Sequence, residues 1–347
     1  MSHTSRRLTQ TPVLGLGRFV YLRLRRALLP DFERRWSRDI DSSLSDVHRK
    51  LSAMEAELAE LRAFKRRMTL DQWLAHSEPQ RERVRQISLS EVEAHIARAI
   101  AATPVVGTPT THMVVEDVLP AEVYELLTAA IPPADLFPDR DPVKRDFEMS
   151  ALGTAPPLTQ DMWRLFDEDI VRRIVAPLVF ARFQSAVETH YADTGGEAFG
   201  RAAAAIPHRT VAGRIQLRRP GYTLKPHLDP KRVVITGLFY FPRPGDADAY
   251  GTQLFTIDRP VVHHGMTTFF PEQAGAVCTL ASTVPYRRNS MLVFVNSRAA
   301  HGASLPADAT LDERYAYQFY VKPLDGDLKK LLKTLPEAAR AAWDEIL

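Results

Sequence analysis

The first regular hydrophobic pattern in the chain covers residues 40–68. Apolar residues recur there at steps of 3, 4 or 7, at Ile40, Leu44, Val47, Leu51, Met54, Leu58, Leu61 and Met68. An average step of 3.5 residues is the heptad repeat of a coiled coil. We therefore expect a coiled coil over residues 39–70 that makes the chain a homo-oligomer. The alternative is a single helix that packs against its own domain.

Charged residues flank this stripe in a pattern that suits parallel helices. The spacing assigns Leu44 to heptad position a. Lys50 of one helix then faces Glu55 of a parallel partner, and Glu57 faces Arg62 in the same way. Both pairs have opposite charges, which favours association of the helix with a second copy of itself.

The rest of the sequence predicts helices followed by a block of strands. A strand is expected over 112–119, a helix over 120–130 and a longer helix over 158–183. Short β-rich runs separated by Pro- and Gly-rich turns then follow at 213–217, 233–241, 253–257, 277–283, 291–296 and 315–321. A last helix is expected over 324–347. This order predicts an α+β fold whose antiparallel strands form a sandwich or barrel.

The Pro-, Thr- and Gly-rich segment 103–111 is typical of a linker, and we place a domain boundary there. The expected organisation is a basic amphipathic arm over 1–38, the coiled coil over 39–70, a helical connector and linker over 71–111, and a C-terminal domain over 112–347.

Charge and cysteine content restrict the function classes. The 347-residue chain has a net charge of +3, too small to indicate a nucleic-acid partner. Residues 1–38 nevertheless hold nine Arg and two acidic residues, and segment 12–30 mixes four Arg with apolar residues. We expect this arm to contact an anionic membrane surface; a surface helix docked on the protein itself and a transit peptide are the alternatives. The lone Cys278 excludes an intramolecular disulfide and a Cys-rich metal site.

The same composition bears on location. No run of 18 apolar residues and no secretory signal are found, and the arginines interrupt the apolar stretch near the N-terminus. We expect a cytoplasmic protein that lies at the membrane periphery.

A metal site is suggested by the motif His227-x-Asp229 in the β-rich region. Residues i and i+2 of an extended segment point to the same face, so both side chains can bind one ion. A second imidazole is available from His301, 72 residues after Asp229, and Arg314 follows 13 residues later. Two imidazoles and one carboxylate form the facial triad of non-haem Fe(II) oxygenases. Each signal alone is weak, because a lone His is more often an ordinary surface or core residue.

The joint pattern resembles the 2-oxoglutarate/Fe(II)-dependent dioxygenase superfamily, particularly bacterial members similar to prolyl hydroxylases. The resemblance covers about residues 112–322. Beyond the triad and Arg314, it rests on three pairs: Gly221-Tyr222, Gly251-Thr252 and Asn289-Ser290.

This resemblance implies a double-stranded β-helix (jelly roll) with flanking helices, in which His227, Asp229 and His301 are the catalytic iron ligands. It implies that Fe(II), 2-oxoglutarate and O₂ are used to hydroxylate an unactivated C–H bond. Arg314 would bind the distal carboxylate of 2-oxoglutarate, and Tyr222 would add a hydroxyl to a cosubstrate carboxylate.

One position departs from the family pattern, and the substrate stays open. Many relatives carry Ser or Thr two residues after the Arg, where this chain has Ala316. A second carboxylate contact would then come from Tyr222 or Arg214. We expect a small-molecule or cell-envelope glycan substrate. The alternatives are a protein prolyl hydroxylase, a non-catalytic β-helix scaffold or ligand-binding module, and a cupin-type metalloenzyme that does not use 2-oxoglutarate.

Overall fold

The computed structural model describes residues 43–64, 77–138, 141–261 and 267–340, together with the single residues 23, 40, 67, 72, 74 and 343. The chain divides into two units, Met1–Met68 and Thr69–Leu347. In the first unit the described residues form a helix over 43–64, and every one of them is exposed. Segment 12–30, expected to contact a membrane, lies outside the described residues except for Arg23, which is helical and exposed. None of the described helices is long and apolar enough to cross a membrane.

The second unit begins with a helix over 77–85 and then alternates helices and strands. Its helices are α2 (Leu89–Ala102), α3 (Ala121–Ala129), α4 (Pro157–Arg164), α5 (Ala176–Gly195), α6 (Glu197–Ala205), α7 (Asp325–Leu332) and α8 (Glu337–Arg340). A π-helix, η3 (Leu165–Val175), joins α4 to α5, and short 3₁₀ turns lie at η1 (Ala134–Leu136), η2 (Met149–Thr154), η4 (Asp248–Tyr250) and η5 (Pro271–Ala274).

Within the described residues, ten strands form two antiparallel sheets. They are β1 (His112–Val115), β2 (Lys144–Glu148), β3 (His208–Arg218), β4 (Thr223–His227), β5 (Ile235–Phe241), β6 (Gln253–Ile257), β7 (Cys278–Thr283), β8 (Ser290–Val295), β9 (Ala300–Ser304) and β10 (Arg314–Pro323). The six-stranded sheet has the order β1-β8-β5-β10-β3-β2, and the four-stranded sheet has the order β4-β9-β6-β7. From β3 to β10 the chain passes back and forth between the sheets, which is the winding of a jelly roll. The predicted α+β class with antiparallel sheets is confirmed.

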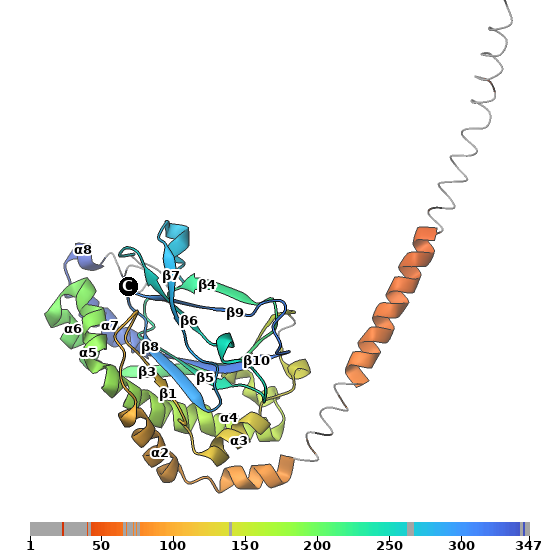
Figure 1. Cartoon of the computed structure of the whole chain (residues 1–347), viewed down its shortest axis with the longest axis horizontal. Coiled ribbons are helices and arrows are strands. Elements are labelled where there is room, and N and C mark those ends of the chain that lie inside the picture. The colour runs from red at the N-terminus through yellow and green to blue at the C-terminus, as the bar shows by residue number, and fades with distance from the viewer. Residues whose placement is uncertain are drawn as a thin grey trace, which may run out of the picture. The chain divides into compact units, whose positions relative to one another are not determined.

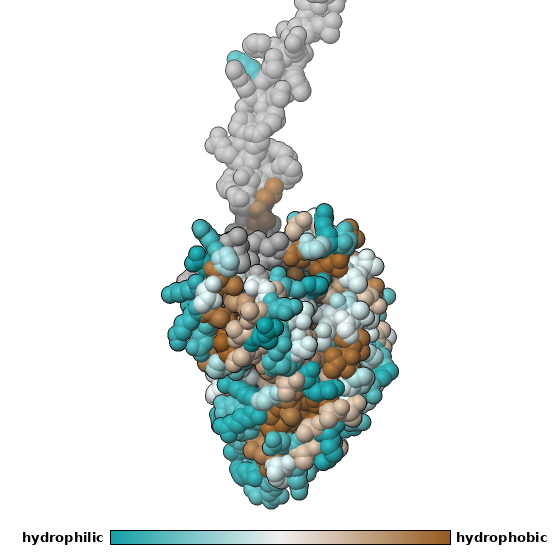
Figure 2. Space-filling view, turned by 90° about the vertical axis from the view of Figure 1, so that its left-hand side faces the viewer, coloured by the Kyte–Doolittle hydropathy of each residue, from teal (hydrophilic) through white to brown (hydrophobic). Residues whose placement is uncertain are grey.

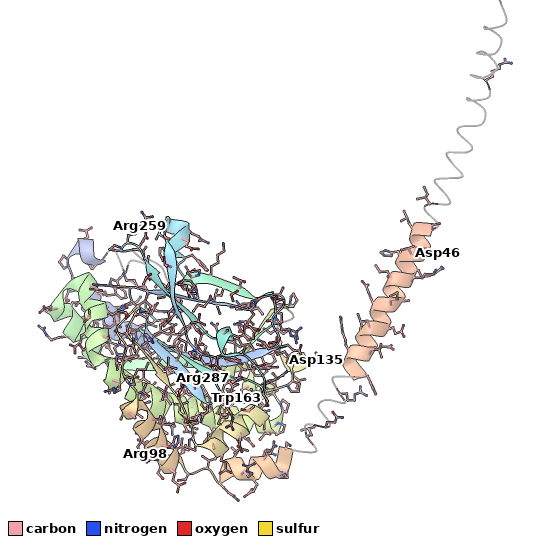
Figure 3. The ribbon with its side chains drawn as sticks, in the orientation of Figure 1. Asp46, Arg98, Asp135, Trp163, Arg259 and Arg287 are labelled. Atoms are coloured by element: carbon pink, nitrogen blue, oxygen red, sulfur yellow. The ribbon has the colours of Figure 1, made fainter. Side chains whose placement is uncertain are left out.

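Helices α2 to α5 cover the outer face of the six-stranded sheet, and the four-stranded sheet lies on the other side (Figure 1). The main core lies between this sheet and the helices. Its centre is a group of aromatic rings in mutual contact, among them Trp163 of α4, Phe166 of η3 and Tyr317 of β10. Trp163 is labelled between helix and sheet in Figure 3. Because odd-numbered β10 residues pack into this core, the even-numbered ones point into the jelly roll.

The structure divides the chain at a different place from the sequence. Val92, Ile96 and Ile100 of α2 are buried in the same core as the sheet. Segment 103–111 therefore connects two elements of one compact unit.

Helical structure extends beyond the expected 158–183, because α4, η3 and α5 follow one another without a break. The surface of the unit alternates hydrophilic and hydrophobic patches on the face shown in Figure 2.

Candidate metal centre

The two histidines of the predicted triad lie opposite each other on neighbouring strands. His227 at the end of β4 and His301 in β9 are paired residues of the four-stranded sheet, and their ring centroids lie 4.1 Å apart. Asp229 follows two residues after β4 and turns its carboxylate toward both rings. Its Oδ1 lies 3.9 Å from Nε2 of His227, and its Oδ2 lies 3.6 Å from Nε2 of His301. All three side chains are buried, and their ligand atoms lie within 4.8 Å of one another.

These side chains fit a divalent metal ion. Nδ1 of His227 donates to the carbonyl oxygen of Lys225 at 2.9 Å, so the lone pair of its Nε2 faces the cluster. In the described part of the chain, Nδ1 of His301 is buried without a hydrogen-bond partner. Burial lowers the pKa of His227. Burial, and to a smaller extent the nearby His227, lower the pKa of His301 to about 3. Both rings are therefore neutral at physiological pH, as metal binding requires.

Asp229 is held in place by three residues, two of which bond its carboxylate and one its backbone. Thr236 of β5 donates its hydroxyl to Oδ2 at 2.6 Å, and Tyr320 of β10 donates to Oδ1 at 3.1 Å. Asn296 accepts from the backbone N–H of Asp229 at 3.2 Å and donates to its carbonyl at 2.9 Å. Burial and Asp229 raise the pKa of Tyr320, so its hydroxyl stays a donor. Such contacts orient a metal-binding carboxylate before the metal arrives.

A buried positive charge without a negative partner lies in the same jelly roll. Arg314 at the start of β10 is only 3% exposed. Its Nε donates to the carbonyl of Tyr250 at 2.6 Å, and its guanidinium packs on the rings of Tyr240 at 5.5 Å and Tyr286 at 5.0 Å. Among the residues that the structure describes, no acidic side chain forms an ion pair with it. A buried charge is normally paired, so this environment suits an anionic ligand.

The neighbouring arginine shows the contrast. Arg218 of β3 is the cross-strand partner of Arg314 and is equally buried. Its guanidinium forms an ion pair with Asp146 of β2 at 2.8 Å and also donates to two backbone carbonyls. Two equally buried arginines in paired positions of one sheet thus differ in the presence of an acidic partner.

One apolar cluster connects Arg314 with the triad. Its members are Leu238, Tyr240, Leu254, Val284, Tyr286, Leu292, Phe294 and Ala316. Arg314 packs on the tyrosines of this cluster, whereas the ring of His301 lies 4.7 Å from that of Phe294. The cluster is buried and lies between the two polar groups, and buried apolar walls of this kind are typical of ligand sites.

Tyr222 lies beside a different arginine from the one expected. Its ring is buried against Leu305 and Leu311, and the guanidinium of Arg218 lies 4.9 Å above it. Its role at a cosubstrate carboxylate stays a prediction. Arg214, the other residue considered for that role, donates its Nε to Gln318 at 2.8 Å.

Arg214 belongs to a polar strip on the inner face of the six-stranded sheet. Oε1 of Gln318 accepts from Arg214 and, at 2.9 Å, from Gln216. Glu148 of the edge strand β2 lies 3.7 Å from the guanidinium of Arg214. Burial raises the pKa of Glu148. Gln318 and Tyr320 lie two residues apart on the same face of β10, and Tyr320 donates to Asp229, so the strip lies next to the triad.

Sequence reasoning missed the residues that hold Asp229 and surround Arg314. Thr236 and Tyr240 are alternate residues of the predicted strand over 233–241, and they point to the same inner face. Strand periodicity could therefore have identified them as inward-facing. Their partners lie on strands distant in sequence, which periodicity does not reveal.

No family model matches the chain, and no curated protein matches it. Solved structures do match. A prolyl-4-hydroxylase from Pseudomonas putida is 13% identical, with coverage of 67% of this chain and 100% of that chain and a TM-score of 0.36. HygX from Streptomyces hygroscopicus, crystallised with nickel, 2-oxoglutarate and hygromycin B, is 16% identical, covers 61% and 82%, and has a TM-score of 0.38. An oxidoreductase of the 2OG-Fe(II) oxygenase family from Burkholderia pseudomallei is 9% identical, covers 68% and 90%, and has a TM-score of 0.34.

The family that the sequence resembles is the one to which these structures belong. At these identities and TM-scores, the activity of this chain has to be inferred from its own residues.

Proposed function

We propose that the chain is an Fe(II)- and 2-oxoglutarate-dependent dioxygenase that hydroxylates a C–H bond. The observation that carries the proposal is a pair of features in one jelly roll: a buried His-Asp-His cluster and the buried, acid-free Arg314. The cluster supports a divalent metal, and the unpaired guanidinium supports a ligand with a carboxylate distant from that metal. A metal site without 2-oxoglutarate, as in a cupin-type enzyme, leaves the buried charge of Arg314 unexplained.

Each residue has a defined role in this proposal. His227, Asp229 and His301 would hold Fe(II). Arg314 would orient 2-oxoglutarate through its distal carboxylate, to which a guanidinium can donate two parallel hydrogen bonds. When bound, the metal and cosubstrate supply the oxygen activation and the electrons for hydroxylation.

The surrounding side chains would control orientation and water. Thr236 and Tyr320 fix the carboxylate of Asp229, so that its two oxygens would already point in the directions needed to hold a metal ion. The apolar cluster between Arg314 and His301 keeps the cosubstrate dry, which strengthens its ion pair with Arg314.

We infer that the substrate is a polar small molecule or a glycan, acted on in the cytoplasm or at the membrane periphery. The support is the strip formed by Glu148, Arg214, Gln216 and Gln318, which presents both charges and amides next to the triad. The alternative substrate is a prolyl residue of a protein, which would make the chain a protein prolyl hydroxylase. A non-catalytic scaffold is disfavoured, because the triad and Arg314 are intact and buried.

The proposal is tested by measuring succinate formed from 2-oxoglutarate by the purified full-length protein with Fe(II) and O₂. Many enzymes of this kind slowly convert 2-oxoglutarate to succinate even when the substrate to be hydroxylated is absent. The assay therefore does not require that substrate to be known. We expect succinate formation that is lost in His227→Ala and in Asp229→Ala, with helical and sheet content unchanged by circular dichroism. Full activity in either folded variant would refute the triad assignment.

A further inference from the structure

The helix over 43–64 carries an apolar surface that none of the described residues of its own unit covers. Six apolar residues lie along one side of it at heptad spacing: Leu44, Val47, Leu51, Met54, Leu58 and Leu61. Ile40, a single described residue before this helix, continues the spacing. The exposed fractions of all seven lie between 44% and 66%. Side chains project from every side of this helix, which carries the labelled Asp46 (Figure 3). Most helical stability in proteins comes from packing of an apolar face, so a continuous exposed apolar stripe on this helix indicates a partner.

We propose that this stripe binds the same stripe of further copies of the chain, as a parallel coiled coil. The proposal goes beyond the enzymatic function and does not depend on it. A heptad stripe is complementary to itself, because position a of one helix packs against position a of the next in a parallel assembly. Leu44, Leu51 and Leu58 occupy a, and d is occupied by Ile40, Val47, Met54 and Leu61. Both core positions of the repeat are therefore apolar, as a coiled coil requires.

Charges beside the stripe support the parallel orientation. In a parallel assembly, Lys50 at position g faces Glu55 at position e of the neighbouring helix, and Glu57 faces Arg62. All four are exposed in the single helix and have room to form these pairs. In an antiparallel pair, Lys50 would instead face Glu57 of its partner. The two orientations therefore predict different partners for the same lysine.

The first test is the mass of the full-length chain by light scattering and sedimentation equilibrium. We expect at least twice the 39.1 kDa of one chain. The double variant Leu51→Glu/Leu58→Glu should return the mass to 39.1 kDa. The matched control is Ala56→Glu/Ala63→Glu, which adds the same charges to the opposite side of the helix and should leave the mass unchanged. Glu is a good helix former, so neither pair of substitutions breaks the helix.

A wild-type protein of 39.1 kDa would overturn the proposal, since the stripe would then serve some other partner. An assembly that survives Leu51→Glu/Leu58→Glu would also overturn it, because the contact would lie elsewhere on the chain.

Charge exchange tests the orientation. Lys50→Glu should raise the dissociation constant roughly fivefold, because each attractive pair becomes repulsive. Adding Glu55→Lys should restore the wild-type value if the helices are parallel. Lys50→Glu with Glu57→Lys is the matched comparison, and it should remain weak. Restoration by Glu57→Lys rather than Glu55→Lys would refute the parallel arrangement.

Discussion

The unpaired charge of Arg314 leads to a quantitative prediction about ligand-dependent stability. Arg314→Met replaces the guanidinium by an apolar side chain of similar length. The variant gives up one short hydrogen bond to Tyr250 and two ring contacts, but it also removes an unpaired buried charge. These contributions oppose each other and are each on the order of 2–4 kcal/mol, so unfolding free energy without ligand should change by no more than about 2 kcal/mol.

The effect of 2-oxoglutarate should differ far more between the two proteins. At a ligand concentration of about 100 Kd, binding stabilises the wild type by about 2.7 kcal/mol. For a folded unit of this size that corresponds to a rise in Tm of roughly 5–10 °C. Arg314→Met should show almost none of this rise, because the distal carboxylate has lost its partner.

The assay is thermal and urea unfolding of the Zn²⁺-loaded protein with and without 2-oxoglutarate. Arg218→Met is the control, because Arg218 is equally buried but already paired with Asp146. It should lose about 2–3 kcal/mol of stability, less than a fully buried pair would, since Asp146 is partly exposed. It should nevertheless keep the increment from 2-oxoglutarate. An equal increment in the wild type and Arg314→Met would refute the role given to Arg314.

Three further predictions concern two residues of strands beside the triad and one histidine of β3 that packs against α5. Gly302→Ala should weaken metal binding at least about tenfold, because a Cβ there would lie 2.7 Å from a backbone carbonyl oxygen of β4. Metal affinity is measured by competition with a chelator, and Gly326→Ala is the control because a Cβ at Gly326 has open space. Tyr320→Phe removes one hydrogen bond to Asp229 and should lower metal affinity roughly tenfold, so an unchanged affinity would contradict the positioning role. Burial lowers the pKa of His208 to about 4. The unfolded chain therefore binds a proton there that the folded chain rejects, and stability should fall as the pH decreases from about 6.5 to 4. His208→Gln should reduce that fall in urea titrations, and an identical pH profile would count against it.

The sequence was most informative where strands are buried on both faces. The apolar runs over 233–241, 291–296 and 315–321 correspond to β5, β8 and β10, all central in the six-stranded sheet. The strands that carry the two histidines are different. β4 reads TLKPH and β9 reads AHGAS, with few apolar residues and no clear alternation. Hydrophobic pattern alone could not predict them, and the site was found from the side chains that can bind metal.

The contacts within the site depend on strand pairing, which a single sequence does not contain. Thr236 and Tyr320 reach the same carboxylate because β5 and β10 are neighbours, although the two residues are far apart in the chain. Likewise, the edge strand β2 reads KRDFE and was not predicted. Its Asp146 forms an ion pair with Arg218, and Arg314 has no such partner among the described residues. The identity of Arg314 could be predicted, whereas its lack of an acidic partner required the structure.

The most direct test of the enzymatic proposal is an anaerobic titration of Fe(II) and 2-oxoglutarate into the full-length protein. Chelation of Fe(II) by 2-oxoglutarate produces a visible metal-to-ligand charge-transfer band. We expect this band in the wild type, its loss in His227→Ala, and a higher 2-oxoglutarate concentration for half-maximal absorbance in Arg314→Met. A folded, iron-loaded protein that shows no band at saturating 2-oxoglutarate would contradict the assignment of the site.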